Sequence, residues 1–304
     1  MVSTISSVRP MTRYLMAALL CLLAPLSFAS ERIEMFIRDD VYVDYLRFLN
    51  GRSPIDVKDF HGDYIRRDVV DMILVQQALM LGGFDKEFDY RPGKVNFRNT
   101  RMLEQGKLLL SFDSYWLADA NELADKLYIS DAVIRHGEYF AGIFYHPENV
   151  KLSKLASIED FRLLTSVSTP RWRTDWQTLS ALSLKELFVE HEWLAQAQMV
   201  HQQWADFMLM PLMPSLNNTY VLENIKLVSH PKYIVSLAGS RHFVVSKQHP
   251  DGLKAFQAIQ AGLQQLRAQG RVQQAYVEAG FIPAANQYEI INRAATAAQK
   301  SSPE

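Results

Sequence analysis

Residues 168–179, STPRWRTDWQTL, place two arginines, two tryptophans and an aspartate in one short window. Guanidinium groups bind carboxylates and phosphates through paired hydrogen bonds, and tryptophan rings hold cations on their faces. Arg171 and Arg173 alternate along the chain, so we expect them to point to opposite sides, one of them toward a ligand. The stretch therefore predicts a site for a carboxylate or phosphate with an aromatic wall, or for a zwitterion shared between an arginine and Asp175.

The same window also has the features of a helix start. Thr174 followed by Gln177 fits a capping box, in which the threonine hydroxyl accepts a hydrogen bond from an early backbone N–H. Asp175 would lie in the first turn, where its charge suits the positive end of the helix dipole. A decorated helix start is thus the alternative to a binding loop. The candidate ligand-binding residues of this stretch are Ser168, Arg171, Trp172, Arg173 and Thr174.

The elements that position this stretch follow from the hydrophobic pattern. Apolar residues in alternation or in short runs predict strands, and apolar residues at helical spacing predict helices that end at glycine. Expected strands cover 33–38, 88–95, 107–113, 161–167, 206–212 and 241–247. Expected helices cover 63–81, 100–105, 174–184, 192–205 and 253–268. Strands that alternate with helices in two successive units predict α/β layers with largely parallel sheets.

The first residues have the order of a secretion signal. Arginines precede an apolar run, 15–26, that is too short to span a bilayer, and small residues suit cleavage near Ala29. The single cysteine, Cys21, lies in that run, so the exported chain would carry no disulfide, thiolate metal site or cysteine nucleophile. We therefore expect a periplasmic protein.

Composition and motifs exclude several classes of function. The formal net charge of −1 gives no reason to expect nucleic acid or a membrane surface as a partner. The sequence contains no glycine-rich phosphate loop, no GxSxG and no HExxH. We expect no cofactor and no bound metal. The 304 residues are enough for one large or two modest domains behind the signal.

Four segments resemble type II periplasmic solute-binding proteins, especially the polar-amino-acid group (family 3) of ABC importer binding proteins. The segment 101–106 and the apolar residues after it resemble that family's helix, glycine and strand before the first ligand loop. Residues 127–131 and 139–145 resemble its F-S-x-P-Y region and first hinge strand. Residues 156–161 resemble its S-L-E-D-L entry to the second lobe, and 241–270 resemble its closing strand, turn and final helices.

The resemblance implies an α/β fold of two lobes joined by two hinge strands, with a ligand held where the lobes close. It assigns 1–29 to the signal peptide, 30–144 and 243–304 to lobe 1, and 145–242 to lobe 2. Loops at the carboxyl ends of strands would contact the ligand. The loops of lobe 1 offer Asp39, Tyr42, Ser111, Asp113 and Trp116.

Two features of the family are missing. Its arginine for the ligand α-carboxylate is absent from 118–125, and its carboxylate for the ligand amine is absent from 208–215. We therefore expect a monomer that captures a small polar or anionic metabolite by hinge closure and serves an ABC importer permease or a sensor receptor. The alternatives are a dehydratase-like enzyme with Asp39, Asp113 or Glu104 as acid or base, and an accessory or sensory protein whose lobes do not close.

Overall fold

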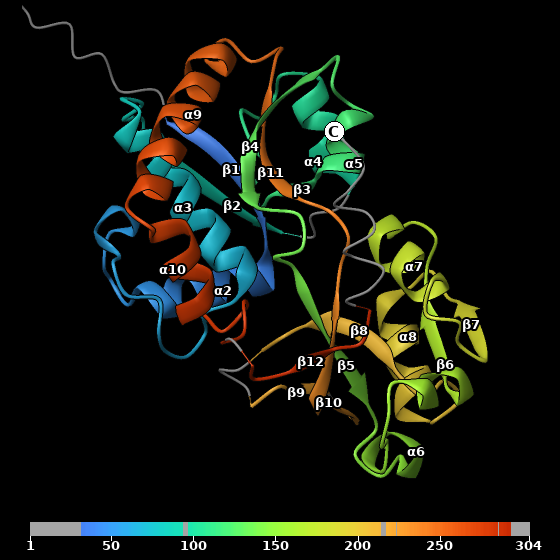
Figure 1. The fold of residues 1–304 in the computed structure, drawn as a ribbon. Coiled ribbons are helices and arrows are strands. Elements are labelled where there is room, and N and C mark those ends of the chain that lie inside the picture. The colour runs from blue at the N-terminus through green and yellow to red at the C-terminus, as the bar shows by residue number, and fades with distance from the viewer. Residues whose placement is uncertain (1–31, 94–96, 214–216, 223, 285, 293–304) are drawn as a thin grey trace, which may run out of the picture.

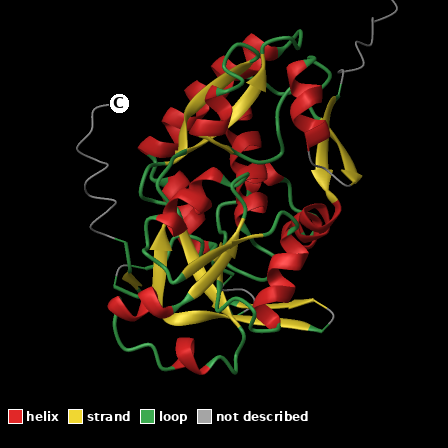
Figure 2. Cartoon of the chain, turned by 90° about the vertical axis from the view of Figure 1, so that its right-hand side faces the viewer, coloured by secondary structure: helices red, strands yellow, loops and turns green. Residues whose placement is uncertain are grey.

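The computed structural model describes residues 32–93, 97–213, 217–222, 224–284 and 286–292 (Figure 1). The predicted signal peptide, 1–29, lies outside the described residues. Across the described ranges, no helix combines the length and the apolar character that crossing a membrane requires. The chain forms two lobes, which lie one above the other in Figure 1. Figure 2 shows helices and strands intermixed along the whole molecule.

Lobe 1 is built on two small sheets with helices packed beside them (Figure 1). β1 (Ile33–Arg38) pairs in parallel with β2 (Phe88–Gly93). β11 (Arg241–Ser246) lies between β3 (Tyr115–Trp116) and β4 (Leu127–Ile134) and is antiparallel to both. The helices of this lobe are α2 (Asp39–Leu49), the 3₁₀ helix η2 (Pro54–Asp56), α3 (Arg67–Leu81), α4 (Phe97–Glu104), α5 (Leu117–Asn121), α9 (Gly252–Ala268) and α10 (Arg271–Glu278).

Lobe 2 is built on a five-stranded sheet and a separate strand pair. The larger sheet has the order β12-β10-β5-β8, and β9 also pairs with β10. Its strands are β5 (Phe140–Tyr145), β8 (Met208–Pro211), β9 (Thr219–Leu222), β10 (Ile225–Ser236) and β12 (Glu289–Ile290). The second pair is β6 (Thr165–Ser168) and β7 (Glu186–Val189), which run parallel. The helices are α6 (Val150–Ser153), the 3₁₀ helix η3 (Glu159–Leu163), α7 (Arg173–Ser180) and α8 (Trp193–His201).

Helices α3 and α9 cross at close range because Gly262 within α9 and Gly82, the C-cap of α3, each lie where the backbone of the other helix approaches. A Cβ at Gly262 would lie 1.9 Å from the carbonyl oxygen of Ala78, and a Cβ at Gly82 would lie 2.0 Å from that of Ala258. No side-chain carbon fits at these distances in a close-packed interior. The two glycines therefore fix α9 against α3, whose first turn carries charges of the candidate site.

The chain after β1 differs from the expected loop, because it continues directly into α2. Arg38 is the N-cap in an extended conformation, and Asp39 and Asp40 occupy the first turn, where acidic residues stabilise a helix. Val41, Tyr45, Phe48 and Leu49 form its buried face. The expected strand 107–113 is also absent as a strand: within it, Leu110 forms one isolated bridge to Val245.

The sheets are less parallel than expected. β5 pairs antiparallel with β10 and with β8, while the parallel pairs are β1 with β2, β6 with β7 and β10 with β12. The reason lies in the connections between lobes, since β5 leads the chain into lobe 2 and β10 leads it back. The predicted division at 144/145 and 242/243 falls inside β5 and β11, and it stays a prediction. The lobes are named here by the sheet to which each strand belongs, which places β5 and β12 in lobe 2 and Arg241 in lobe 1. The pairing of β12 with β10 brings the chain near residue 290 back to the sheet of lobe 2.

Candidate functional site

A network of buried charges lies at the start of α3 in lobe 1. Arg67, the first residue of α3, donates hydrogen bonds to the carboxylates of Asp68 and Asp71. Its Nη2 lies 3.4 Å from Oδ2 of Asp113. Asp71 is fully buried and also accepts hydrogen bonds from the Ser114 backbone N–H (3.0 Å), the Ser114 hydroxyl (2.7 Å) and the Tyr276 hydroxyl. Every oxygen of the Asp71 carboxylate therefore has a donor, as a buried charge requires.

Arg241 closes this network from the first position of β11. Its Nε donates to the Ser114 hydroxyl at 2.9 Å, its Nη2 donates to the Ser114 carbonyl oxygen, and Nη2 lies 3.7 Å from Oδ2 of Asp113. Strand pairing places Arg241 opposite Trp116. The guanidinium carbon lies 4.9 Å from the ring centre of Trp116 and 5.9 Å from that of Tyr139. Ion pairing, hydrogen bonds and cation–π contacts thus hold this side chain on several sides.

Lobe 2 reaches the same place through the first turn of α7. Gly239, just before β11, has the ring of Trp116 and the Thr174 side chain beside it, since a Cβ at Gly239 would lie 3.0 Å from the ring and 3.7 Å from Thr174 Cγ2. Asp175 is partly buried and lies within the electrostatic influence of Arg241. One helix turn of lobe 2 therefore faces the Trp116 and Arg241 pair of lobe 1. We call this group the interlobe site; its members are Arg67, Asp68, Asp71, Ser111, Asp113, Ser114, Trp116, Tyr139, Thr174, Asp175 and Arg241.

Two carboxyl groups of the interlobe site have raised pKa values. Burial raises the pKa of Asp113, and the positive charges of Arg67 and Arg241 oppose that rise. Burial raises the pKa of Asp175 to about 6, opposed by its own backbone N–H and by the charge of Arg241. Asp175 forms no ion pair with any residue that the structure describes. Both groups are therefore costly to keep ionised while the site holds no further cation.

Arg173 joins the two lobes directly. It is the first residue of α7, it donates to the carboxylate of Glu122, and its Nε lies 3.9 Å from Oδ1 of Asp119. Asp119 and Glu122 belong to α5 and to the residue that follows it, in lobe 1. This guanidinium is therefore engaged by protein carboxylates. Arg171, in contrast, is exposed, and only its backbone N–H has a described hydrogen bond, to the Thr169 hydroxyl at 3.3 Å.

The predicted capping box at Thr174 is wrong. Helix α7 begins one residue earlier, at Arg173, with Trp172 as its N-cap and without a side-chain capping hydrogen bond. Trp172 retains 36% of its surface exposed, whereas Thr174 is buried in the first turn. The Thr174 carbonyl oxygen instead accepts a hydrogen bond from the Thr178 hydroxyl at 2.7 Å. Thr174 therefore faces Gly239 and lobe 1, and does not close the end of its own helix.

The structure brings some predicted site residues together and separates others. Ser111 donates to Oδ1 of Asp113 at 3.0 Å, so this pair lies in the interlobe site with Trp116 and Thr174. Ser168 is buried at the end of β6. The remaining two lie on α2, where Asp39 is exposed and the ring centre of Tyr42 is 5.7 Å from that of Tyr90. The role of all of these residues in ligand binding stays a prediction.

Sequence reasoning missed several residues of the site: Arg67, Asp68, Asp71, Tyr139 and Arg241. Each lies at or near the start of a helix or strand, whereas the search covered loops after strands. Asp175 was predicted both as a helix-dipole residue and as a possible partner for a zwitterion. The available signal was a charged residue at the start of a mainly apolar segment, as in Arg241-His242-Phe243-Val244-Val245. A charge in that position needs a partner when the strand is buried.

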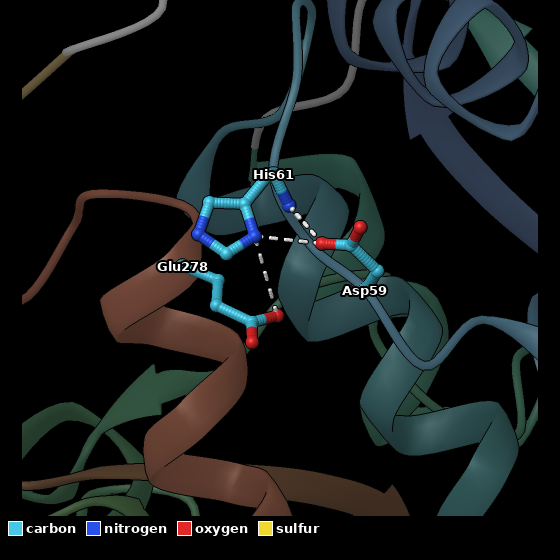
Figure 3. A group of neighbouring side chains, drawn as sticks. All are labelled: Asp59, His61 and Glu278. Carbon is cyan, nitrogen blue, oxygen red and sulfur yellow. Dashed lines mark hydrogen bonds and ion pairs between the residues drawn. The ribbon is translucent and has the colours of Figure 1, made fainter.

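A different cluster joins a loop of lobe 1 to α10 (Figure 3). Asp59 and His61 come from the loop and Glu278 from the helix, and one ligand atom from each lies within 4.8 Å of the others. His61 Nδ1 is 2.7 Å from Oδ1 of Asp59, and Oε2 of Glu278 accepts a hydrogen bond from the Phe60 N–H at 2.9 Å. His61 and Asp59 are exposed. These contacts anchor the loop on α10.

Comparison with known proteins bears on the fold. No protein-family model matches the chain, and no curated protein matches it in sequence. The probable amino-acid ABC transporter extracellular-binding protein ytmK of Bacillus subtilis is 13% identical over 83% of this chain and 99% of its own, with a TM-score of 0.51. The periplasmic VFT2 domain of Bordetella pertussis BvgS is 10% identical over 91% of this chain and 99% of its own, also with a TM-score of 0.51. These likenesses confirm the predicted α/β fold, the two-lobe type II periplasmic binding fold.

Proposed function

We propose that this two-lobe protein binds a small polar solute between its lobes and presents it to an ABC importer or to a sensor, after export to the periplasm. The observation that carries the proposal is that side chains from both lobes meet at one place. Thr174 and Asp175 of lobe 2 face Trp116 and Arg241 of lobe 1. A solute that contacts both lobes stabilises the closed arrangement over the open one, which is how hinge closure captures a ligand.

Different residues of the interlobe site offer different kinds of contact to a solute. The rings of Trp116 and Tyr139, whose centres are 4.7 Å apart, offer an aromatic wall. Asp113 and Asp175 offer carboxylates from opposite lobes. The buried network around Asp71 fixes the positions of Arg67 and Arg241, so that these two guanidiniums hold the site together. The likeness to ytmK, whose description names an extracellular-binding protein, agrees with this proposal.

A thermal-shift screen tests the proposed function. The protein, freed of co-purified solute by unfolding and refolding, is heated with amino acids, organic acids, sugars and amines. A solute that binds only the folded state raises the melting temperature as its concentration passes the dissociation constant. Trp116→Ala should remove the response, and Trp204→Ala, an exposed tryptophan after α8, should retain it. A melting temperature unmoved by every solute would refute a binding function.

A second candidate is an enzyme on the same fold, and one observation favours it. Asp175 has a pKa of about 6, which suits a general acid or base near neutral pH. This is the carboxyl group that an enzyme of this kind needs at the place where the lobes meet. Incubating the protein with each stabilising solute and following the solute by NMR separates the two functions. A chemically unchanged solute after long incubation excludes turnover of that solute.

A further inference from the structure

The carboxylates of the interlobe site outnumber its cations. Arg67 and Arg241 supply the positive charges, and the negative charges come from Asp68, Asp71, Asp113 and Asp175. Among the described residues, the site therefore has a formal charge of −2 when all of its carboxyl groups are ionised.

The charged neighbours of the site do not correct this excess. Arg38 and Arg66 face the carboxylates of Asp40 and Asp44, and Nη2 of Arg66 also lies 3.4 Å from Oδ2 of Asp68. The charges of these two arginines and two further carboxylates cancel, so the enlarged group keeps its formal charge of −2. On the side of α5, Arg173 faces both Asp119 and Glu122, which adds a further negative charge. A cation is therefore the species that would neutralise this part of the protein.

The excess falls on two particular carboxylates. Asp68 and Asp71 each accept a hydrogen bond from Arg67. Asp113 has its nearest cationic nitrogens at 3.4 and 3.7 Å, beyond the roughly 2.7–2.9 Å of a strong charge-assisted hydrogen bond. Asp175 has no ion pair at all within the described ranges. The two carboxylates that lack a close cation thus come from opposite lobes.

The guanidiniums of the site have no free face for an anion. Arg67 is surrounded by three carboxylates, and Arg241 is bound to Ser114 and covered by the rings of Trp116 and Tyr139. An anionic solute would have to displace Asp113 and would then meet the charge of Asp175. This arrangement argues against the anionic metabolite that the arginines of 168–179 suggest, since Arg173 is already paired and Arg171 is exposed.

We propose that the solute carries a cationic nitrogen, an amine or a guanidinium, which binds between Asp113 of lobe 1 and Asp175 of lobe 2. This inference rests on the proposed function, because it names the chemical class of solute for the same site. The raised pKa values of both carboxyl groups agree with it, because burial makes each group costly to ionise. A bound cation would relieve that cost in both lobes together and so favour closure.

Matched probes that differ in charge test the inference. The full mature protein is titrated at about pH 7.5 with putrescine, butanediol and succinate, and with cadaverine, pentanediol and glutarate, using thermal shift and calorimetry. Within each series the carbon chain is constant and the end groups are cationic, neutral or anionic. We expect the amines alone to raise the melting temperature. Asp175→Asn should weaken amine binding by about tenfold or more, as the loss of a hydrogen bond to a charged group does.

Asp125→Asn, which changes an exposed carboxylate next to α5, is the matched control and should bind the amines as the unchanged protein does. Stabilisation by the diols or the diacids instead of the amines would overturn the inference and leave the proposed function standing. Equal amine affinity in Asp175→Asn and the unchanged protein would also overturn it, because the cation would then bind elsewhere. Failure of these probes together with the wider metabolite screen would refute the proposed function itself.

Discussion

Replacing Asp175 with asparagine tests the electrostatics of the interlobe site without any ligand. Burial raises the pKa of this carboxyl from 3.8 to about 6. A difference of this size corresponds to about 3 kcal/mol against the ionised group in the folded protein, at about 1.4 kcal/mol for each pH unit. Because Asp175 keeps partial contact with solvent, we expect about 1–2 kcal/mol of this to be measurable.

The sign of the effect follows from the direction of the pKa. A carboxyl whose folded-state pKa is raised carries no penalty while it is protonated, and the folded protein loses stability as the pH rises through about 6. Asp175→Asn should therefore match the unchanged protein near pH 4 and exceed it by about 1–2 kcal/mol above about pH 7. For a chain of this length, that gain corresponds to a melting temperature higher by a few degrees.

Urea unfolding at a series of pH values measures this difference, with Asp125→Asn as the control and with co-purified solute removed beforehand. The acid sensitivity of all other groups cancels when the variant is compared with the unchanged protein at each pH. A gain that is the same at every pH would show that the asparagine acts through packing. A loss of stability near pH 8 would refute the assignment of Asp175 as an unpaired buried carboxylate.

Three other variants test other contacts of the structure. Asp71→Asn should lower the free energy of unfolding by about 3–5 kcal/mol, because the new amide nitrogen would face another donor and Arg67 would lose a buried charged partner. A decrease below about 1 kcal/mol would contradict this account. Gly262→Ala should lower the free energy of unfolding, measured by thermal unfolding, by about 1–3 kcal/mol or more, because the added methyl group would overlap the Ala78 carbonyl. An unchanged free energy would mean that α3 and α9 can move apart without cost. Arg173→Glu should open the lobes, because the new carboxylate would repel Glu122. Small-angle X-ray scattering should then report a larger radius of gyration. An unchanged radius would show that the ion pair between Arg173 and Glu122 does not hold the lobes together.

Sequence reasoning found the elements whose hydrophobic pattern is long and regular. α9 and β11 lie where the pattern placed them, and α3 begins at Arg67, four residues after its expected start. α2 was missed because its first residues, Asp39 and Asp40, are charged and only four residues form its buried face. The strands β9 and β10 had no prediction, because their alternation is interrupted by polar residues and by Pro231, and their place depends on pairing with β5.

The candidate site was predicted in part for a similar reason. Asp113, Trp116 and Thr174 follow segments whose pattern predicts strands, so a rule about strand ends found them, although residues 107–113 form no strand in the structure. Arg241 has no local signal that sets it beside Asp113, which is far away in sequence, because the pairing of β11 with β3 creates that contact. The two guanidiniums of the interlobe site come from the starts of α3 and β11, so the sequence of one segment alone could not reveal that they lie together.

Within the described residues, the chain passes between the lobes three times, from β4 to β5, from β10 to β11 and from α10 to β12. The first two passages are tied together by a hydrogen bond from the Leu237 N–H to the Tyr139 carbonyl oxygen at 2.9 Å. The third ends at β12, which holds to β10 through the Ile291 N–H and the Ile234 carbonyl oxygen at 3.0 Å. Since β12, β10 and β5 lie side by side in the sheet of lobe 2, the three passages leave that sheet from neighbouring positions. A rotation of one lobe against the other would therefore have to bend all three passages together.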